Sequence, residues 1–324
     1  MSKKNGEKRL DRLDCLIIGG GVAGLTAAFY LARFRRKIAV YDGGRSRATL
    51  IPTTHNCPGF PGGVDGPDFI GRLLKQARSH GVTPIAREIE HLARTDHGFI
   101  ASCADGEISA RNVLVATGLS DRQPRLSGHD QAVADGLVRY CPVCDGYEAA
   151  GLNIAVLGEG RDAFNKARFL RVYSTSVALV SERRQLDGIT EMELREAGIT
   201  HQGGARQLTR TRNHIDITLA DGKRLRFDCI YPALGSRTGA HLAVNLGARA
   251  TADGCLVVDA FQSTNIAGLY AAGDVVSDLH QIAVATGHAA IAATHIHKCL
   301  AHNPAQPSHA SSACSRDQQL KHQP

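Results

Sequence analysis

A glycine-rich turn between an apolar strand and a helix, within residues 14–42, constrains the fold of this chain most strongly. The stretch reads DCLIIGGGVAGLTAAFYLARFRRKIAVYD. Its first apolar run is typical of a strand buried on both faces. A helical pattern follows the glycines, and a second apolar strand ends at Asp42. This order predicts a βαβ unit of a doubly wound α/β fold that binds a dinucleotide.

Each glycine of this unit has a physical role. Gly19 permits the tight turn, Gly21 lets the backbone approach a pyrophosphate, and Gly24 lets helix and strand pack closely. The helix N-terminus offers N–H groups without intrahelical partners to the phosphates. Asp42 can accept hydrogen bonds from a ribose diol. A glycine-rich turn without nucleotide function is the alternative, and the register of strand, helix and acid argues against it.

Residues 153–184 repeat the pattern, as NIAVLGEGRDAFNKARFLRVYSTSVALVSERR. Gly158 and Gly160 take the first two glycine positions, and Ala163 takes the third. Two such units predict two nucleotides in one chain. A flavin and a nicotinamide are the natural pair, because a flavin accepts a hydride and releases electrons singly or in pairs.

A third signature lies at residues 268–300. A short strand ends there at Gly273 and Asp274, and a long helix rich in small residues follows. An acid at such a strand end can bind a ribityl hydroxyl, and the amides at the start of the helix can face a flavin. Two further strand ends, residues 113–118 and 230–235, finish in a small residue and glycine, where the backbone must pass close to another group.

Composition argues against several functional classes. The 324 residues suffice for two domains, and 43% hydrophobic with 21% charged residues is ordinary for a soluble globular protein. The net charge of +7 is scattered and no nucleic-acid-binding motif accompanies it, so we expect no nucleic acid partner. The N-terminal apolar stretch is short and interrupted by Asp14. We therefore expect a mature start, with neither signal peptide nor membrane span.

One close cysteine pair, Cys141 and Cys144, stands in RYCPVCDGYE at residues 139–148. The chain has nine cysteines, an odd number, and the other seven are dispersed, which suits a reducing cytoplasm. Zinc needs four ligands and no second pair exists, so we predict no metal site. A redox dithiol and two inert thiols both stay possible from the pair alone. The flanking nucleotide units favour the dithiol.

Residues 304–324 form a polar, proline-bearing end without periodicity, which predicts a disordered tail. Its single cysteine, Cys314, is interpreted as incidental, because it has no partner nearby in the sequence.

An ordered set of motifs runs along the chain: GGGVAG, NCPGFPGGVDGPDF, VATG, CPVCDG, the second glycine unit, and AAGD with HQIAVATG. With this set the chain resembles the low-molecular-weight thioredoxin reductase-like family of FAD- and NAD(P)-dependent disulfide oxidoreductases. The resemblance covers residues 14–300. It implies an α/β fold of two Rossmann-like, three-layer nucleotide-binding domains, the second inserted into the first. Residues 11–121 and 250–303 would bind FAD, and residues 122–249 would bind NAD(P) and carry the CxxC. It also implies rotation of the inserted domain and a homodimer.

The resemblance also implies roles for individual residues. Cys144 is implied to be the thiol next to the flavin, Cys141 the one that exchanges with substrate, and Asp145 the acid that manages the proton. The positions that match the family's FAD site are Gly19, Gly21, Gly24, Asp42, Asn56, Thr117, Gly273, Asp274 and Gln281.

The residues expected to bind the nicotinamide nucleotide depart from the family's pattern. Members of this family usually place His-Arg-Arg after the second glycine unit to hold the 2′-phosphate of NADPH, whereas this chain has Ser181, Glu182 and Arg183. Glu182 repels a phosphate and suits a free ribose diol, while Arg183 and Arg184 still attract it. We therefore expect a weakened preference for NADPH, with NADH or no efficient reductant as alternatives.

Three functions stay open. In the leading one, electrons pass from NAD(P)H through FAD and the Cys141–Cys144 disulfide to a thioredoxin-like protein. In the second, a dithiol oxidase closes a disulfide in a small molecule and passes electrons from FAD to oxygen. The third is a flavin-binding sensor without fast turnover. Asp145 favours the reductase, because similar oxidases tend to have histidine there, whereas the short Gly-Tyr-Glu after the cysteines favours the oxidase.

Overall fold

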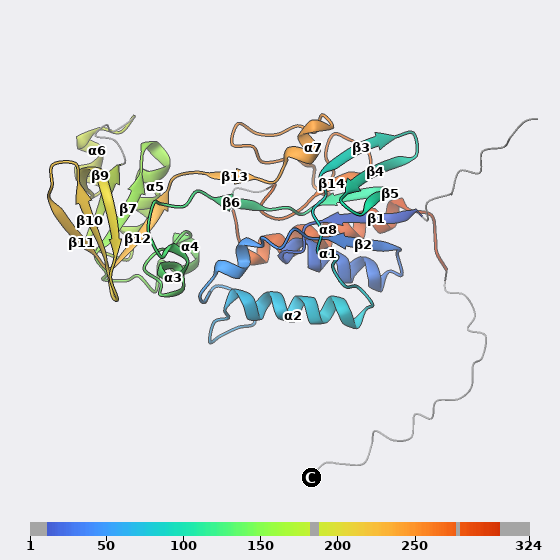
Figure 1. The fold of residues 1–324 in the computed structure, drawn as a ribbon, viewed down its shortest axis with the longest axis horizontal. Helices are drawn as coiled ribbons and strands as arrows, with labels where there is room; N and C mark the ends of the chain where they lie inside the picture. The colour runs from blue at the N-terminus through green and yellow to red at the C-terminus, as the bar shows by residue number, and fades with distance from the viewer. Residues whose placement is uncertain (1–11, 182–187, 277–278, 305–324) are drawn as a thin grey trace, which may run out of the picture.

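The computed structural model describes residues 12–181, 188–276 and 279–304, which form two units lying side by side along the long axis of the molecule (Figure 1). Each unit has one six-stranded sheet. The chain builds most of the first unit, crosses to the second, and returns to complete the first. The α/β class is confirmed, with two Rossmann-like units and the second lying within the chain of the first.

The sheet of the first unit has the order β2-β1-β5-β4-β3, and β14 pairs with β5 beside β4. Strands β2, β1 and β14 and the end of β5 run parallel, whereas β3 and β4 add an antiparallel extension. These strands are β1 (Leu13–Ile18), β2 (Ile38–Tyr41), β3 (His91–Thr95), β4 (Gly98–Cys103), β5 (Gly106–Val115) and β14 (Leu269–Ala271).

Strand β1 is buried on both faces, as its apolar run predicts. Cys15 and Ile17 pack with the helices on one face, while Leu16 and Ile18 pack with β4 and residues 240–275 on the other. Helices α1 (Val22–Arg33), α2 (Gly66–Ser79) and α8 (Ile282–Cys299) form the first layer, with the short 3-10 helix η1 (Arg47–Leu50) before α2. The short helix α7 (His241–Asn245) belongs to the second layer.

Helix α8 is fastened at its C-terminal end by Arg36, whose side chain is buried. The guanidinium donates to the carbonyls of His297, at 3.0 Å, and Ala301, at 2.9 Å. These bonds satisfy carbonyls that the end of a helix leaves without intrahelical partners. At the opposite end of α8, Gln281 is the N-cap residue.

The second unit has the sheet order β11-β10-β9-β8-β7-β12, with β12, β7, β8 and β9 parallel. Alternate residues of β7 face α5 and α6 on one side and α3 on the other. The elements are β7 (Ile154–Gly158), β8 (Val177–Ser181), β9 (Thr200–Arg210), β10 (Ile215–Leu219), β11 (Arg224–Phe227), β12 (Cys229–Ala233), α3 (His129–Ala134), α4 (Pro142–Asp145), α5 (Gly160–Leu170) and α6 (Glu191–Glu196).

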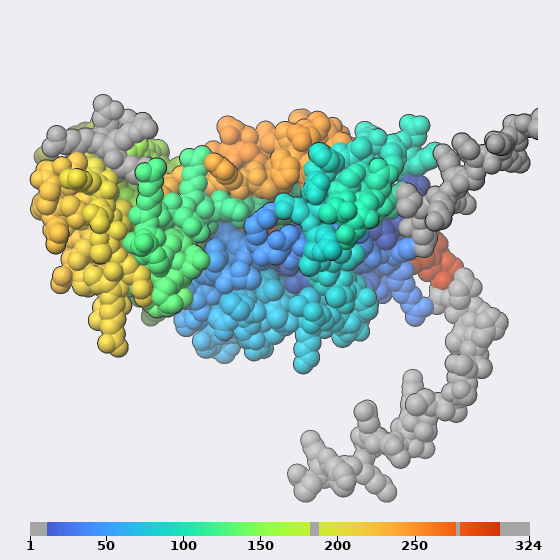
Figure 2. Space-filling view, viewed as in Figure 1, coloured from blue at the N-terminus to red at the C-terminus, as the bar shows by residue number. Residues whose placement is uncertain are grey.

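Two short antiparallel strands, β6 (Leu119–Asp121) and β13 (Ser236–Thr238), connect the units (Figure 1). The segment around α3 and α4 lies between the two units and contacts the N-terminal part of the first unit (Figure 2). None of the helices in the described ranges is both long and apolar enough to cross a membrane. Residues 305–324 of the expected tail lie outside the described ranges.

The turn after β1 depends on close backbone packing. A Cβ atom on Gly24 would lie 1.8 Å from the carbonyl oxygen of Gly19, so only glycine lets α1 start against this turn. Gly19 itself has φ +108°, and a Cβ there would lie 2.3 Å from the carbonyl oxygen of Ala116 at the end of β5. Both glycines are required by geometry, as the sequence pattern predicts.

Gly24→Ala should lower the free energy of unfolding by about 2 kcal/mol, because the backbone must shift to admit the methyl group. Gly71→Ala is the matched control, since nothing lies within 4 Å of the added Cβ on the exposed face of α2. That change should raise the free energy of unfolding by about 0.5–1 kcal/mol. Urea denaturation measures both, and equal effects of the two changes would contradict this account of the turn.

Candidate active site

A cavity of about 950 Å³ extends between the first glycine turn and the CxxC motif. Its lining includes Gly19, Gly21 and Asp42 from the first unit and the two cysteines of the second. Asp42 lies against the turn, since a Cβ on Gly20 would be 2.7 Å from its carboxyl carbon. The bare backbone, the adjacent acid and a volume at the upper end of the range for ligand pockets fit an extended dinucleotide such as FAD.

The cysteines form a disulfide on the short helix α4. Cys141 is the N-cap residue, Pro142 occupies the first turn, and Cys144 follows one turn later, so both sulfur atoms lie on the same side of α4. Both residues are half-buried and line the cavity. The pair is therefore a disulfide placed beside a nucleotide-sized cavity, rather than two inert thiols in a loop.

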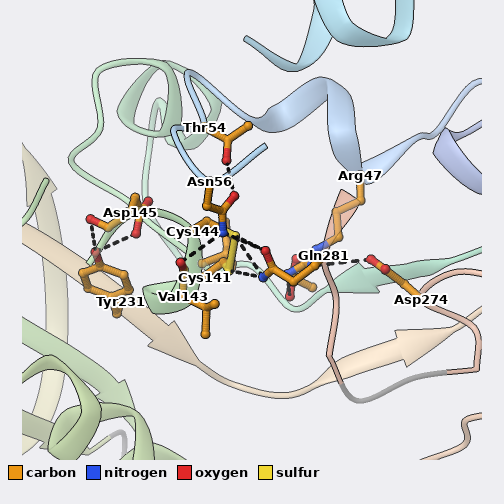
Figure 3. The surroundings of a disulfide bond; sticks show 12 residues. Arg47, Thr54, Asn56, Cys141, Val143, Cys144, Asp145, Tyr231, Asp274 and Gln281 are labelled. Carbon is orange, nitrogen blue, oxygen red and sulfur yellow. Dashed lines mark hydrogen bonds and ion pairs between the residues drawn. A yellow bond between two sulfur atoms is a disulfide. The ribbon is translucent and has the colours of Figure 1, made fainter. Parts of the chain in front are cut away.

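The side chain of Gln281, from the first unit, contacts this disulfide directly, and Asn56 contacts the helix that carries it (Figure 3). The Gln281 amide nitrogen lies 3.3 Å from Cys141 Sγ and 3.4 Å from Cys144 Sγ. The Asn56 amide donates to Gln281 Oε1 at 2.8 Å and to the Val143 carbonyl, within α4, at 3.1 Å. Thr54 Oγ1 donates to Asn56 Oδ1 at 2.7 Å. These bonds join the two units at the redox centre.

Asp145 ends α4, and its carboxyl group is directed toward β12 (Figure 3). The Tyr231 hydroxyl donates to Asp145 Oδ1 at 2.7 Å, and Arg139 donates to the Asp145 carbonyl at 3.1 Å. Burial raises the pKa of Asp145 above its ordinary value, although the Tyr231 hydrogen bond and the Arg139 charge oppose the rise. Asp145 follows Cys144 in the chain, and a carboxyl group with a raised pKa is suited to holding and releasing a proton.

Lys166, on α5, supports the same region from within the second unit. Its ammonium group donates to the carbonyls of Tyr140, at 3.2 Å, and Pro232, at 2.6 Å. Burial lowers the pKa of Lys166 to about 8. The lysine thus ties the residue that precedes Cys141 to β12, the strand that carries Tyr231.

Arg47 connects three segments at the other side of the disulfide. Its guanidinium binds both carboxylate oxygens of Asp121, at 2.6 and 3.1 Å, and lies 3.4 Å from Asp274 Oδ2. Asp121 ends the connecting strand β6, and Asp274 follows β14. All three side chains are about four-fifths buried, and all three residues line the cavity.

Residues 13–289 match the family described as pyridine nucleotide-disulphide oxidoreductase, which is most of the chain. The chain belongs to this family. It is a flavin-dependent pyridine nucleotide-disulfide oxidoreductase of the thioredoxin reductase-like type, with FAD and a nicotinamide nucleotide as its cofactors.

The curated relatives support this assignment. The chain is 30% identical to the thioredoxin reductase of Streptomyces coelicolor, an alignment that covers 85% of this chain and 89% of the relative. It is 28% identical to NADPH-dependent thioredoxin reductase 3 of Arabidopsis thaliana over 89% of this chain, and it spans 58% of that longer protein. The crystal structure of thioredoxin reductase from Streptococcus pyogenes has the same fold, with a TM-score of 0.81 at 24% identity over 89% of this chain and 97% of that one.

In this disulfide oxidoreductase most of the predicted site residues line the cavity between the first glycine turn and the CxxC motif. Gly24 lies behind the turn in α1, and Thr117 donates to the Gly239 carbonyl at 2.8 Å, where the two connecting segments meet. The predicted residues that line the cavity are Gly19, Gly21, Asp42, Asn56, Thr117, Cys141, Cys144, Asp145, Gly273, Asp274 and Gln281.

The second glycine unit is formed but does not line this cavity. Gly158 ends β7, Gly160 begins α5, and Ala163 is fully buried in that helix. The three residues proposed to choose the nucleotide, Glu182, Arg183 and Arg184, lie outside the described residues. Across the described ranges, no group of three or more histidine, cysteine, aspartate or glutamate side chains is placed to hold a metal ion.

Several supporting residues could not be found from sequence patterns. Thr54, Tyr231 and Lys166 belong to no motif. Tyr231 and Lys166 each act by reaching a residue far away in the chain, whereas Thr54 acts on Asn56, two residues along. Arg47 offers a weak signal, since an arginine shortly after a nucleotide-binding unit is common on any surface. Its pairing with Asp121 and Asp274 appears only when three distant segments meet.

Asp145→Asn should stabilise the protein at neutral pH, because ionising Asp145 in its buried site costs free energy. A raised pKa in the folded state means that this cost is absent below the ordinary aspartate pKa and develops as pH rises through the folded pKa. The gain in free energy of unfolding should therefore be larger at pH 8 than at pH 4, as urea midpoints would show. Asp96→Asn, in the exposed β3–β4 turn, is the control. A gain independent of pH would contradict the burial argument.

Arg47→Met should lower the free energy of unfolding by about 1–3 kcal/mol, because Asp121 and Asp274 lose their shared cation in a mostly buried site. Arg45→Met removes the ion pair with Glu88, whose side chains are 69% and 54% exposed, and should change stability by less than about 1 kcal/mol. The two variants are compared by chemical denaturation. An Arg47 effect as small as that of Arg45 would show that the three-way contact is not stabilising.

Proposed function

We propose that this protein reduces a disulfide of a thioredoxin-like protein with electrons from NAD(P)H, through FAD and the Cys141–Cys144 pair. The observation that carries this proposal is the disulfide in the wall of the FAD-sized cavity, beside Asn56 and Gln281. Relatives named thioredoxin reductase support the substrate class.

Different residues of the chain would hold different parts of FAD. We assign Gly19, Gly21 and Asp42 to hold the adenosine and pyrophosphate parts of FAD, with Asp274 at the ribityl part. When bound, FAD accepts a hydride and passes an electron pair to the disulfide.

The dithiol then transfers the electrons by exchange. Adding the electron pair and one proton to the Cys141–Cys144 bond yields one thiol and one thiolate. A thiolate attacks the partner's disulfide, a mixed disulfide forms, and the second cysteine displaces the reduced partner. We assign Cys144 to the flavin side, Cys141 to the partner, and Asp145 to the proton that moves with each exchange.

Transfer from the nicotinamide requires a second arrangement of the units. The unit of Gly158, Gly160 and Ala163 does not line the cavity in which the disulfide lies. We propose that residues 122–249 rotate as a domain against residues 11–121 and 250–303. The hinge is the two-stranded connection of β6 and β13, the narrowest link between the units in Figure 1.

We further propose a weak preference for NADPH over NADH, because Glu182 disfavours a 2′-phosphate that Arg183 and Arg184 attract. A homodimer in the cytoplasm is part of the same proposal. The cysteines of the described residues suit a reducing compartment, because Cys141–Cys144 is the one disulfide found among these residues.

The dithiol oxidase and the sensor are not favoured. Curated relatives over most of the chain are named thioredoxin reductase, and Asp145 is held in a specific contact with Tyr231 beside the pair. A sensor without turnover has no need for such an acid.

Anaerobic mixing of the purified holoenzyme with NADPH or NADH, followed by thioredoxin or oxygen, tests the proposal. Both nucleotides should bleach the flavin at rates within about tenfold of each other, because one repulsive carboxylate offsets the arginines by roughly 1 kcal/mol. Thioredoxin should then restore the flavin colour.

In Cys144→Ser the flavin should still be reduced by the nucleotide, but the variant should fail to reduce thioredoxin. Cys299→Ser changes an exposed thiol at the end of α8 and should behave as wild type. Fast reoxidation by oxygen with a small dithiol as substrate contradicts the reductase. A large NADPH preference contradicts only the assignment of Glu182.

A further inference from the structure

We propose that Thr54, Asn56 and Gln281 form an amide relay that directs the N–H groups of Gln281 at the Cys141–Cys144 pair and stabilises the thiolate formed on its reduction. The relay deepens the proposed disulfide reductase and rests on that function. It assigns Gln281, implied by the family resemblance to contact flavin, a second role toward the dithiol.

Hydrogen-bond chemistry fixes the direction of the relay. The Val143 carbonyl can only accept, so the Asn56 atom 3.1 Å away must be the amide nitrogen. That nitrogen can only donate, so the Gln281 atom 2.8 Å from it must be the amide oxygen. The Gln281 nitrogen, with its two N–H groups, is therefore the atom nearest to both sulfurs, whereas the Gln281 oxygen lies farther away, 3.8 Å from Cys144 Sγ. Amide orientation is often ambiguous, but here each end is determined by its neighbour.

Thr54 anchors the relay in the first unit. Its side chain is buried, and its hydroxyl donates to Asn56 Oδ1, which is the atom that the Val143 contact requires to be an acceptor. The Thr54 backbone forms two hydrogen bonds with Val64, at 2.9 and 3.0 Å, which hold the segment in place. Asn56 itself is exposed, and this anchor acts with the bonds to Val143 and Gln281 to keep its amide from turning toward water.

The relay favours the reduced pair over the disulfide. Disulfide sulfur is a weak hydrogen-bond acceptor, whereas a thiolate carries a full negative charge and forms strong charge-assisted bonds. Reduction adds two electrons and one proton to the S–S bond and leaves one thiol and one thiolate. Donors already aimed at the sulfurs stabilise that charge without reorganising, as preorganised donors do for other developing anions. With 3.3 and 3.4 Å to the two sulfurs, Gln281 can donate to whichever one bears the charge.

Gln281→Glu tests the relay, since it replaces the donor with an acceptor of the same shape. The holoenzyme is reduced with dithiothreitol, and iodoacetamide alkylation of Cys141 and Cys144 is followed by mass spectrometry across pH. Alkylation near pH 7 should slow by about tenfold or more, the size expected for losing one hydrogen bond to a charged group. The midpoint potential of the pair in dithiothreitol redox buffers should become more negative, because the reduced form loses stabilisation.

Two further variants separate the relay from local damage. Thr54→Val has nearly the same shape and reaches the sulfurs only through Asn56 and Gln281, so it should shift alkylation and potential in the same direction by a smaller factor. Gln76→Glu, on the exposed face of α2, is the control for added charge and should change neither. Thr54→Val also decides the question if Gln281→Glu does not fold.

Unchanged alkylation and potential in both Gln281→Glu and Thr54→Val overturn the relay. An effect in Gln281→Glu alone also overturns it, because the orientation would then not depend on Thr54. These readouts use no electron acceptor. A protein that fails to reduce thioredoxin but shows the shifts retains the relay and loses the proposed substrate, so the two failures are distinguishable.

Discussion

The hydrogen bonds from Asn56 and Gln281 to helix α4 are the contacts on which the site depends, because they join two separately built units at the disulfide. Each unit has its own sheet and its own core, and neither contains a complete redox centre. The first supplies the cavity and the amides, and the second supplies the cysteines. Helix α8, which begins after Gln281, packs in the core of the first unit and is held at its C-terminal end by Arg36.

Buried charge is arranged on both sides of the disulfide. On one side Asp145 is held by Tyr231, and Lys166 binds backbone carbonyls. On the other, Arg47 pairs with Asp121. Burial acts in opposite directions on the two titratable groups near the pair, since it raises the pKa of Asp145 and lowers that of Lys166. Both shifts bring the pKa of the group closer to neutral pH, where a group that exchanges protons with a dithiol must titrate.

Much of this molecule could be predicted from its sequence, because the decisive features are local. The roles of Gly19 and Gly24 follow from a turn that admits no Cβ, and the burial of β1 follows from four consecutive apolar residues. The contacts of Asp274 and Gln281 could not be predicted in the same way. Their partners, Arg47 and the cysteines, are more than a hundred residues distant, and only the tertiary fold brings them together. The second nucleotide unit was found by pattern, but its separation from the cavity depends on how the two units are arranged.

We propose that the Cys141–Cys144 disulfide exchanges electrons with the flavin of the same chain. Anaerobic reductive titration of the holoenzyme with dithionite tests it most directly, because a flavin and a disulfide each accept an electron pair. The wild-type flavin should become fully reduced only after four electrons per chain, and the flavin of Cys141→Ser after two. Full bleaching of the wild-type flavin by two electrons, with no further uptake, would contradict it.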